Sequence, residues 1–501
     1  MDALSNLMMG LAVALTWNNL LYAFLGALIG TLVGVLPGLG PLATMAMLLP
    51  TVYLLDATPA LIMLAGIYYG AQYGGSTTAI LINIPGESSA VVTAIDGYQM
   101  ARQGRAGTAL ATAALGSFFA GCVATIVIAF FAEPLSHMAL KFGAREYFSL
   151  MILGLVGSVA LASGSMLKAV CMVLLGLLLG QIDTDLISGT ERFTMGIDEL
   201  SDGINFVVLA MGLFGLGEII SNLGKPAEER EVFTSKVKGL WLSKDDFKKA
   251  WPASVRGTAL GSALGILPGA GAVLASFSAY ALEKKVARDP SQFGHGDIRG
   301  VAGPESANNA AAQTSFIPML SLGLPSGAIM ALMIGAMIIK GIQPGPQVMT
   351  SNPSLFWGFV ASMWVGNLML VILNLPLIGI WIKLLTVPYR LLFPAILCFC
   401  CIGLYTLNNN NFDIYSAVFF GAAGYICHKL RCEAAPLLLG FVLGPMIEEN
   451  LRRALLLSSG DWATFVSSPI STTMLLLSAG LIIAVAVPAL SRRRAAAFQE
   501  D

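Results

Sequence analysis

The chain carries the stretch Gly34-Val35-Leu36-Pro37-Gly38-Leu39-Gly40 and repeats it in its second half as Gly265-Ile266-Leu267-Pro268-Gly269-Ala270-Gly271. Each copy lies in an apolar segment and joins a proline to glycines, residue types that interrupt a helix. A second, looser match follows in the same order, because Thr77 to Gly86 parallels Ser315 to Ser326. These matches predict two copies of one structural unit.

The composition around these motifs is that of a membrane protein. Hydrophobic residues make up 56% of the 501 residues and charged residues only 11%, whereas soluble proteins have about 25% charged residues. A helix that crosses a bilayer needs about 20 apolar residues. The windows that meet this requirement include 108–132, 204–222, 356–382 and 470–490. We therefore predict an all-α, polytopic protein in a lipid bilayer. The net charge of −1 gives no indication of a nucleic acid partner.

A polar, lysine-rich segment separates the two copies. We predict a first membrane repeat at residues 1–223, a cytoplasmic linker at 224–250 and a second membrane repeat at 251–501. Two alternatives for the broken segments remain open, a functional re-entrant structure and a plain kink, since proline and glycine are frequent in membrane helices.

Lysine and arginine predict how the repeats are oriented. The basic segments 96–107 and 283–300, like the linker and the tail, are expected on the cytoplasmic side. The corresponding segments of the opposite halves, 341–354 and 52–60, contain no lysine or arginine. Equivalent loops are thus expected on opposite sides of the membrane, which indicates two inverted repeats.

The apolar segment 251–282 lies between two basic segments and is too short for two spans, which need about 40 residues. We predict a re-entrant or broken-helix hairpin with its tip at Pro268–Gly271. Residues 21–55 are expected to form the matching hairpin from the opposite face, with its tip at Pro37–Gly40.

Unwound backbone at such tips suits a charged ligand. An unsatisfied backbone group costs several kcal/mol in hydrocarbon, so non-helical backbone occurs only inside protein or beside water. Freed amides at a half-helix N-terminus suit an anion, and freed carbonyls suit Na⁺. Small polar side chains follow each tip, and at membrane depth such groups usually face the interior and are often functional.

We accordingly predict one substrate site between the tips and the polar stretches. Its candidate residues are Pro37, Gly38, Gly40, Ser76, Thr77, Thr78, Asn83, Pro85, Gly86, Pro268, Gly269, Gly271, Asn308, Asn309, Thr314, Ser315, Pro325 and Ser326. The candidate Na⁺ ligands are Gly38, Gly269, Glu305 and Asn308. Helix packing is the alternative explanation for the small residues of 74–78, because small residues let membrane helices approach closely.

The polar motifs contain no lysine or arginine. A bound carboxylate would then need a co-bound cation, because desolvating its charge without a counter-charge is costly. This predicts ion coupling, with Na⁺ preferred and H⁺ open, and no other cofactor. The sequence has no Walker lysine motif, HExxH or GxSxG, so we do not expect an enzyme. A passive anion channel remains the alternative.

The chain resembles the large membrane subunit of the tripartite tricarboxylate transporters from about Asn18 to Leu490. The most specific matches are Gly34–Gly40, Tyr68 through Glu87, Gly303 through Ala310 and Leu437 through Arg453. The resemblance implies a secondary carrier in the bacterial inner membrane that imports di- or tricarboxylates. It also implies two partners, a small four-helix membrane subunit and a periplasmic solute-binding protein. An elevator-like motion is expected by analogy with other carriers that have two hairpins.

Overall fold

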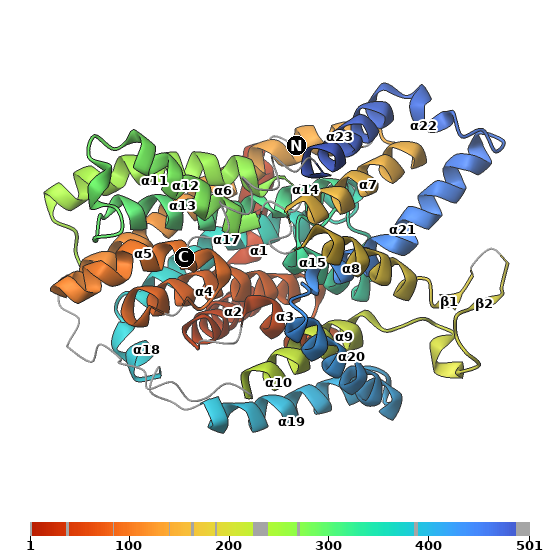
Figure 1. The fold of residues 1–501 in the computed structure, drawn as a ribbon, viewed down its shortest axis with the longest axis horizontal. Helices are drawn as coiled ribbons and strands as arrows, with labels where there is room; N and C mark the ends of the chain where they lie inside the picture. Colours follow the sequence, from red (N-terminus) through yellow and green to blue (C-terminus); the bar gives the residue numbers. More distant parts are fainter. Residues whose placement is uncertain are drawn as a thin grey trace.

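The computed structural model describes residues 3–36, 40–83, 85–139, 141–161, 165–185, 188–223, 239–267, 271–384 and 389–486. Within these ranges the protein is helical apart from one short antiparallel pair of strands, in which Asp183 pairs with Arg192. Figure 1 shows the helices as one elongated bundle. The prediction of an all-α protein is confirmed.

The first half is built from helices of very different length. Its elements are α1 (Ala3–Ala14), α2 (Trp17–Val35), α3 (Pro41–Leu54), α4 (Ala57–Ile82), η1 (Ser88–Ala90), α5 (Val91–Met100), η2 (Ala101–Arg105), α6 (Ala106–Ala139), α7 (Ala144–Leu161), α8 (Met166–Leu179), β1 (Asp183–Thr184), β2 (Glu191–Arg192), η3 (Asp198–Leu200), α9 (Phe206–Ala210), η4 (Met211–Leu216) and α10 (Gly217–Leu223).

The second half follows a similar pattern. Its elements are α11 (Lys244–Gly265), α12 (Gly271–Val286), η5 (Pro290–Gln292), α13 (Arg299–Thr314), α14 (Phe316–Leu322), α15 (Ala328–Ile339), α16 (Gln347–Ser351), α17 (Pro353–Asn374), α18 (Ile378–Leu384), α19 (Tyr389–Asn408), α20 (Asn411–Lys429), α21 (Ala435–Leu457), α22 (Thr464–Ser467) and α23 (Pro469–Ala486).

Three helices in the described ranges are long and apolar enough to cross a membrane. They are Trp17–Val35, the helical run Ser88–Phe131 and Pro353–Asn374. Other apolar helices, such as Pro41–Leu54 and Ala328–Ile339, are shorter than the roughly 20 residues that a full span requires. The described part of the chain therefore combines helices long enough to cross a bilayer with shorter apolar helices.

Two stripes of glycines bring helices into close contact at equivalent places in the two halves. The stripes consist of Gly26, Gly30 and Gly34 on α2, and Gly257, Gly261 and Gly265 on α11. A Cβ atom at these positions would overlap the backbone of α4 or of α13, respectively. These helix pairs can approach so closely only because the contact residues have no side chain.

The hairpin predicted for 251–282 is present as α11 and α12. Both helices pack on α13 and on each other, and Figure 1 shows the three side by side. The Arg256 guanidinium of α11 donates two hydrogen bonds, of 2.7 and 2.6 Å, to the carboxylate of Glu283 on α12. The tip residues Pro268 and Gly269 lie outside the described residues.

Helix α11 begins earlier than the predicted linker boundary, so residues 244–250 are helical. The reason is a local cap, because Ser243 Oγ accepts a hydrogen bond of 3.1 Å from the Asp246 amide. Residues 224–238 of the predicted linker lie outside the described residues, as do the basic residues of the tail.

The first half differs from this hairpin. Helices α2 and α3 share few contacts, and α3 packs instead against α15, α19, η4 and α4. Helix α3 thus has other neighbours than α2 and does not pair with it as α12 pairs with α11, whereas the prediction made residues 21–55 a matching hairpin. The tip residues Pro37 and Gly38 also lie outside the described residues.

A separate bundle of α7, α8, α21 and α23 forms the right side of the molecule in Figure 1. The strand pair β1–β2 is attached to it through Arg192, which pairs with Asp183 at 2.6 Å and with Glu448 of α21 at 2.8 Å. Glu448 also pairs with Arg452 one turn further along α21, at 2.6 Å. These ion pairs fasten the strands to the helices.

Candidate substrate and ion site

Two helices end abruptly at matching positions of the two halves. Helix α4 is almost entirely buried and ends at Asn83, which has left-handed backbone (φ 57°). Helix α14 ends at Gly323, which is also left-handed (φ 70°). Each of these residues stands two positions before a proline, Pro85 or Pro325. A left-handed residue terminates a helix, so the repeated motif produces the same kind of chain break twice.

After the first break the chain folds back against its own helix. The Gly86 amide donates a hydrogen bond of 3.4 Å to the Gly75 carbonyl. A Cβ on Gly86 would lie 2.7 Å from Gly75 Cα and would also overlap the Gly34 carbonyl of α2. Three backbone segments meet here because all three residues are glycine. This close approach carries Glu87 into the interior of the bundle.

The carboxylate of Glu87 is held by groups from both halves of the chain. Its Oε1 atom accepts a hydrogen bond from the Ser89 hydroxyl and another, of 3.3 Å, from Asn308 Nδ2 on α13. Gly75 of α4 makes room for it, since a Cβ there would lie 2.9 Å from Glu87 Cγ. Gly75 therefore allows the Glu87 side chain to pack against α4, and this contact positions the Glu87 carboxylate.

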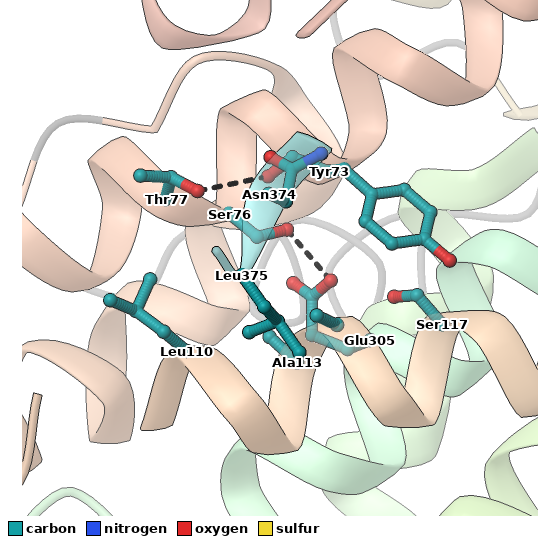
Figure 2. Close-up of a pocket in the computed structure, with 10 residues that line it drawn as sticks. Tyr73, Ser76, Thr77, Leu110, Ala113, Ser117, Glu305, Asn374 and Leu375 are labelled. Atoms are coloured by element: carbon teal, nitrogen blue, oxygen red, sulfur yellow. Dashed lines mark hydrogen bonds between the residues drawn. The ribbon is translucent and has the colours of Figure 1, made fainter. Parts of the chain in front are cut away.

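A second carboxylate, Glu305 on α13, is completely buried. Its Oε2 atom accepts a hydrogen bond of 2.7 Å from Ser76 of α4, and its Oε1 atom accepts one from Thr93 of α5. Figure 2 shows the Ser76 hydroxyl directed at Glu305. In the described part of the chain, both carboxylates accept hydrogen bonds from hydroxyl or amide groups and form no ion pair with lysine or arginine.

Further polar pairs continue along the contact between α13 and α6. Asn309 Nδ2 donates to Ser117 Oγ at 2.6 Å, and Thr125 donates to Gln313 Oε1 at 2.9 Å. Among the residues that the structure describes, Asn308 Oδ1 and Asn309 Oδ1 have no hydrogen-bond partner. Buried polar atoms are nearly always satisfied, so these free acceptors suit a ligand that donates or coordinates.

Several predicted residues have hydroxyls bonded within their own helix or chain segment. The bonds run from Thr77 to Tyr73 O, Thr78 to Gly75 O, Thr314 to Ala310 O, Ser315 to Ala312 O and Ser326 to Ser315 O. Their oxygen lone pairs stay available as acceptors, but the hydroxyl protons are already used.

The two described tip glycines take different positions. The Gly40 amide, at the N-terminus of α3, donates to Glu218 of α10 at 3.3 Å. Gly271 starts α12 with left-handed backbone (φ 57°). Pro325 is buried, whereas Asn83 is exposed. Four predicted site residues, Pro37, Gly38, Pro268 and Gly269, lie outside the described residues, and the predicted Na⁺ ligands Gly38 and Gly269 are among them.

Other residues of the cluster were not predicted. Thr93 and Ser117 contact the site from α5 and α6, and Tyr73 and Asn374 line the pocket beside Glu305. The sequence did contain a signal for Asn374. It and Asn367 are the two asparagines of the stretch 356–382, which is otherwise almost entirely apolar. The contacts of Thr93 and Ser117 depend on helix packing and leave no sequence signal.

A buried carboxylate on a helix packed beside a chain break, among apolar helices, is typical of one class of protein, the membrane transport proteins. The family model of the tripartite tricarboxylate transporter TctA family matches residues 20–439, and the chain belongs to this family. It is therefore a transporter subunit that acts with partner subunits and a binding protein, as the resemblance implied.

Two relatives come from Agrobacterium vitis. The chain is 58% identical over 501 residues, all of both chains, to an uncharacterized 52.8 kDa protein in the TAR-I ttuC' 3'region. It is also 58% identical over 241 residues, 48% of this chain and 100% of the relative, to an uncharacterized protein in the TAR-II ttuC' 3'region. No solved structure matches the chain.

Proposed function

We propose that this protein is the membrane-embedded carrier of an ion-coupled importer for di- or tricarboxylates. In this proposal a periplasmic solute-binding protein delivers the substrate, a small four-helix membrane subunit completes the complex, and the complex lies in the bacterial inner membrane. The observation that carries the proposal is a pair of carboxylates held by hydroxyls and an amide, the buried Glu305 within α13 and the half-buried Glu87 after the chain break that follows α4.

Ion coupling follows from charge. A buried carboxylate such as Glu305 and a half-buried one such as Glu87, without a basic partner among the described residues, are costly in a membrane. A carboxylate substrate adds further negative charge. Cations must therefore bind with the substrate, so that a gradient of Na⁺, or of H⁺, drives its uptake. We favour Na⁺ because the cluster offers hard oxygen ligands, among them the free Asn308 Oδ1.

The proposed substrate site lies between the two chain breaks and the two tips. It comprises the candidate residues of both halves, among which Ser76 donates to the Glu305 carboxylate and Asn308 donates to the Glu87 carboxylate. We further propose that residues 1–223 and 251–501 are inverted repeats around this site. Support comes from the matching glycine stripes and the matching left-handed helix ends.

The test is uptake of radiolabelled di- and tricarboxylates into proteoliposomes that contain this subunit, the small subunit and the binding protein. Concentrative uptake that needs an inward Na⁺ gradient is the expected result. Uptake driven only by a pH gradient would support a carrier coupled to H⁺ and exclude coupling to Na⁺. Equilibration without accumulation under either gradient would support the passive channel and exclude the carrier.

A further inference from the structure

A small polar pocket lies beside Glu305, where α4, α6, α13 and the end of α17 meet (Figure 2). Its volume is about 10 Å³, which is room for about one water-sized particle. Polar lining comes from Tyr73, Ser76 and Thr77 of α4, Ser117 of α6, Glu305 of α13 and Asn374 of α17. A carboxylate substrate cannot fit in this volume, so the pocket suits a smaller ligand, although it shares Ser76 and Thr77 with the substrate site proposed above.

Two buried oxygens in this lining have no hydrogen-bond partner among the described residues. They are Asn374 Oδ1 and the Tyr73 hydroxyl, on residues whose exposed fractions are 4% and 3%. The amide orientation of Asn374 is fixed, because its Nδ2 donates to Leu370 O at 2.9 Å and to Thr31 Oγ1 at 3.3 Å. Its oxygen is thus the atom left over.

The ligands and the volume select a class of ion. Carboxylate, amide and hydroxyl oxygens are hard ligands, and each Glu305 oxygen keeps a lone pair after its one hydrogen bond. Mg²⁺ usually keeps several waters, which a space for about one particle does not accommodate. Ca²⁺ carries two positive charges, which the single carboxylate of the lining does not balance. A single negative charge balances a single positive charge. The pocket therefore fits a dehydrated monovalent cation.

We propose that this pocket is a Na⁺ site in which Glu305, Asn374 and the neighbouring hydroxyls coordinate the ion. Its part in transport rests on the function proposed above, but binding itself does not. The ligands come from both halves of the chain, because Ser76 and Ser117 precede the linker and Glu305 and Asn374 follow it. A bound ion would hold the two halves together at the point where the substrate carboxylates need counter-charge.

The test measures ion binding without substrate. The full-length chain is purified in Na⁺-free buffer, and its thermal unfolding is followed while NaCl replaces choline chloride at constant ionic strength. A ligand that binds only the folded state raises its stability with concentration. We expect a saturable rise of the midpoint by about 3 °C or more, and no comparable rise with KCl.

The variants Asn374→Leu, Asn374→Ala and Glu305→Gln should abolish this response, each judged against its own midpoint in choline chloride so that altered stability does not confuse the result. Asn367→Leu is the matched control. Asn367 is equally buried, donates to the carbonyl four residues earlier at 2.9 Å and has a free Oδ1 among the described residues, but it does not line the pocket. It should keep the response.

No Na⁺-specific rise in the wild-type chain, an equal rise with KCl, or an undiminished rise in the Asn374 variants would overturn the site. The failure of the proposed function gives a different result. Na⁺ stabilisation that depends on Asn374, without any carboxylate uptake in proteoliposomes, would leave the site and remove the transport role. Na⁺-driven uptake that Asn374→Leu leaves unchanged would support the proposed function and exclude a role for this site in it.

Discussion

Ser76 on α4 and Glu305 on α13 are joined by a hydrogen bond of 2.7 Å across 229 residues of sequence. Because Ser76 precedes the linker and Glu305 follows it, this bond ties the first half of the chain to the second inside the bundle. Any motion that separates α4 from α13 must break it and expose a carboxylate.

Removing the charge of Glu305 should stop coupled uptake. Glu305→Gln keeps the size of the side chain but loses the counter-charge for a cation, so we expect uptake to fall at least about tenfold, which corresponds to about 1.4 kcal/mol. Ser76→Ala should have a smaller effect, because Thr93 still donates to the carboxylate. Initial uptake rates at equal membrane abundance measure both. The exposed Glu199, changed to Gln, is the control, and normal uptake by Glu305→Gln would contradict the assignment.

Asn308 and Asn83 should each be required for uptake. Asn308→Ala removes a donor to Glu87 and a free amide oxygen. At Asn83 alanine alone is ambiguous, since left-handed backbone costs a non-glycine residue about 1–2 kcal/mol. Asn83→Gly removes the side chain without this strain. We expect both Asn83 variants to lose uptake at normal membrane abundance. Full activity of Asn83→Gly would reduce the role of Asn83 to helix termination.

Gly261→Ala should loosen the contact between α11 and α13. Its Cβ would lie 2.7 Å from Ala307 Cα, and overpacking of this kind costs about 1–3 kcal/mol. The midpoint of thermal unfolding should drop. Gly154→Ala in α7 is a matched control, because a Cβ there meets nothing within 4 Å. It should be neutral or stabilising, since alanine is the better helix former. Equal effects of both changes would rule out the glycine stripe as the cause.

Asp297 should stabilise the loop before α13 in a pH-dependent way. Burial by itself would raise the pKa of Asp297, but the hydrogen bonds and the positive charge of Arg299 lower that pKa overall. The distance between Arg299 Nη2 and Asp297 Oδ2 is 2.5 Å. A carboxylate with a lowered folded-state pKa stabilises the fold above its unfolded value of about 3.9, and this contribution is lost as the pH falls through the folded value.

The unfolding midpoint of Asp297→Asn should therefore be lower than that of the wild type at pH 7, by an amount that corresponds to about 1 kcal/mol or less. This difference should shrink as the pH falls below about 4. A difference that stays constant across this range would show that charge is not involved.

The inverted arrangement can be tested with cysteines introduced at Ala57 and Ser291 in a chain whose seven native cysteines have been replaced. The flanking loops carry opposite charge patterns, with no basic residue at 52–60 and several at 283–300. An impermeant thiol reagent should label Ala57→Cys from the periplasmic side and Ser291→Cys only after the membrane is permeabilised. Labelling of both from the same side would exclude the inverted repeat.

The comparison of prediction with structure is clearest at the hairpins and the site. Proline, glycine and apolar length predicted the α11–α12 hairpin, because local backbone chemistry determines where a helix is interrupted. The same signal at Pro37–Gly40 did not indicate that α3 packs against α15 and α19. Composition also did not indicate that the polar residues 244–250 of the predicted linker are helical, because this depends on the Ser243 cap that begins α11.

Composition alone indicates a membrane protein, since 11% charged residues cannot cover a soluble surface. The polar motifs predicted that Ser76, Asn308 and Glu305 belong to a site. Which of these side chains meet depends on the packing of the helices. The contact of Ser76 with Glu305 and the position of Asn374 in the same pocket depend on how closely α4, α13 and α17 approach. Residue type and spacing indicate local conformation. The approach of distant helices depends on glycines at their contacts, and which helices these glycines bring together is seen only in the folded structure.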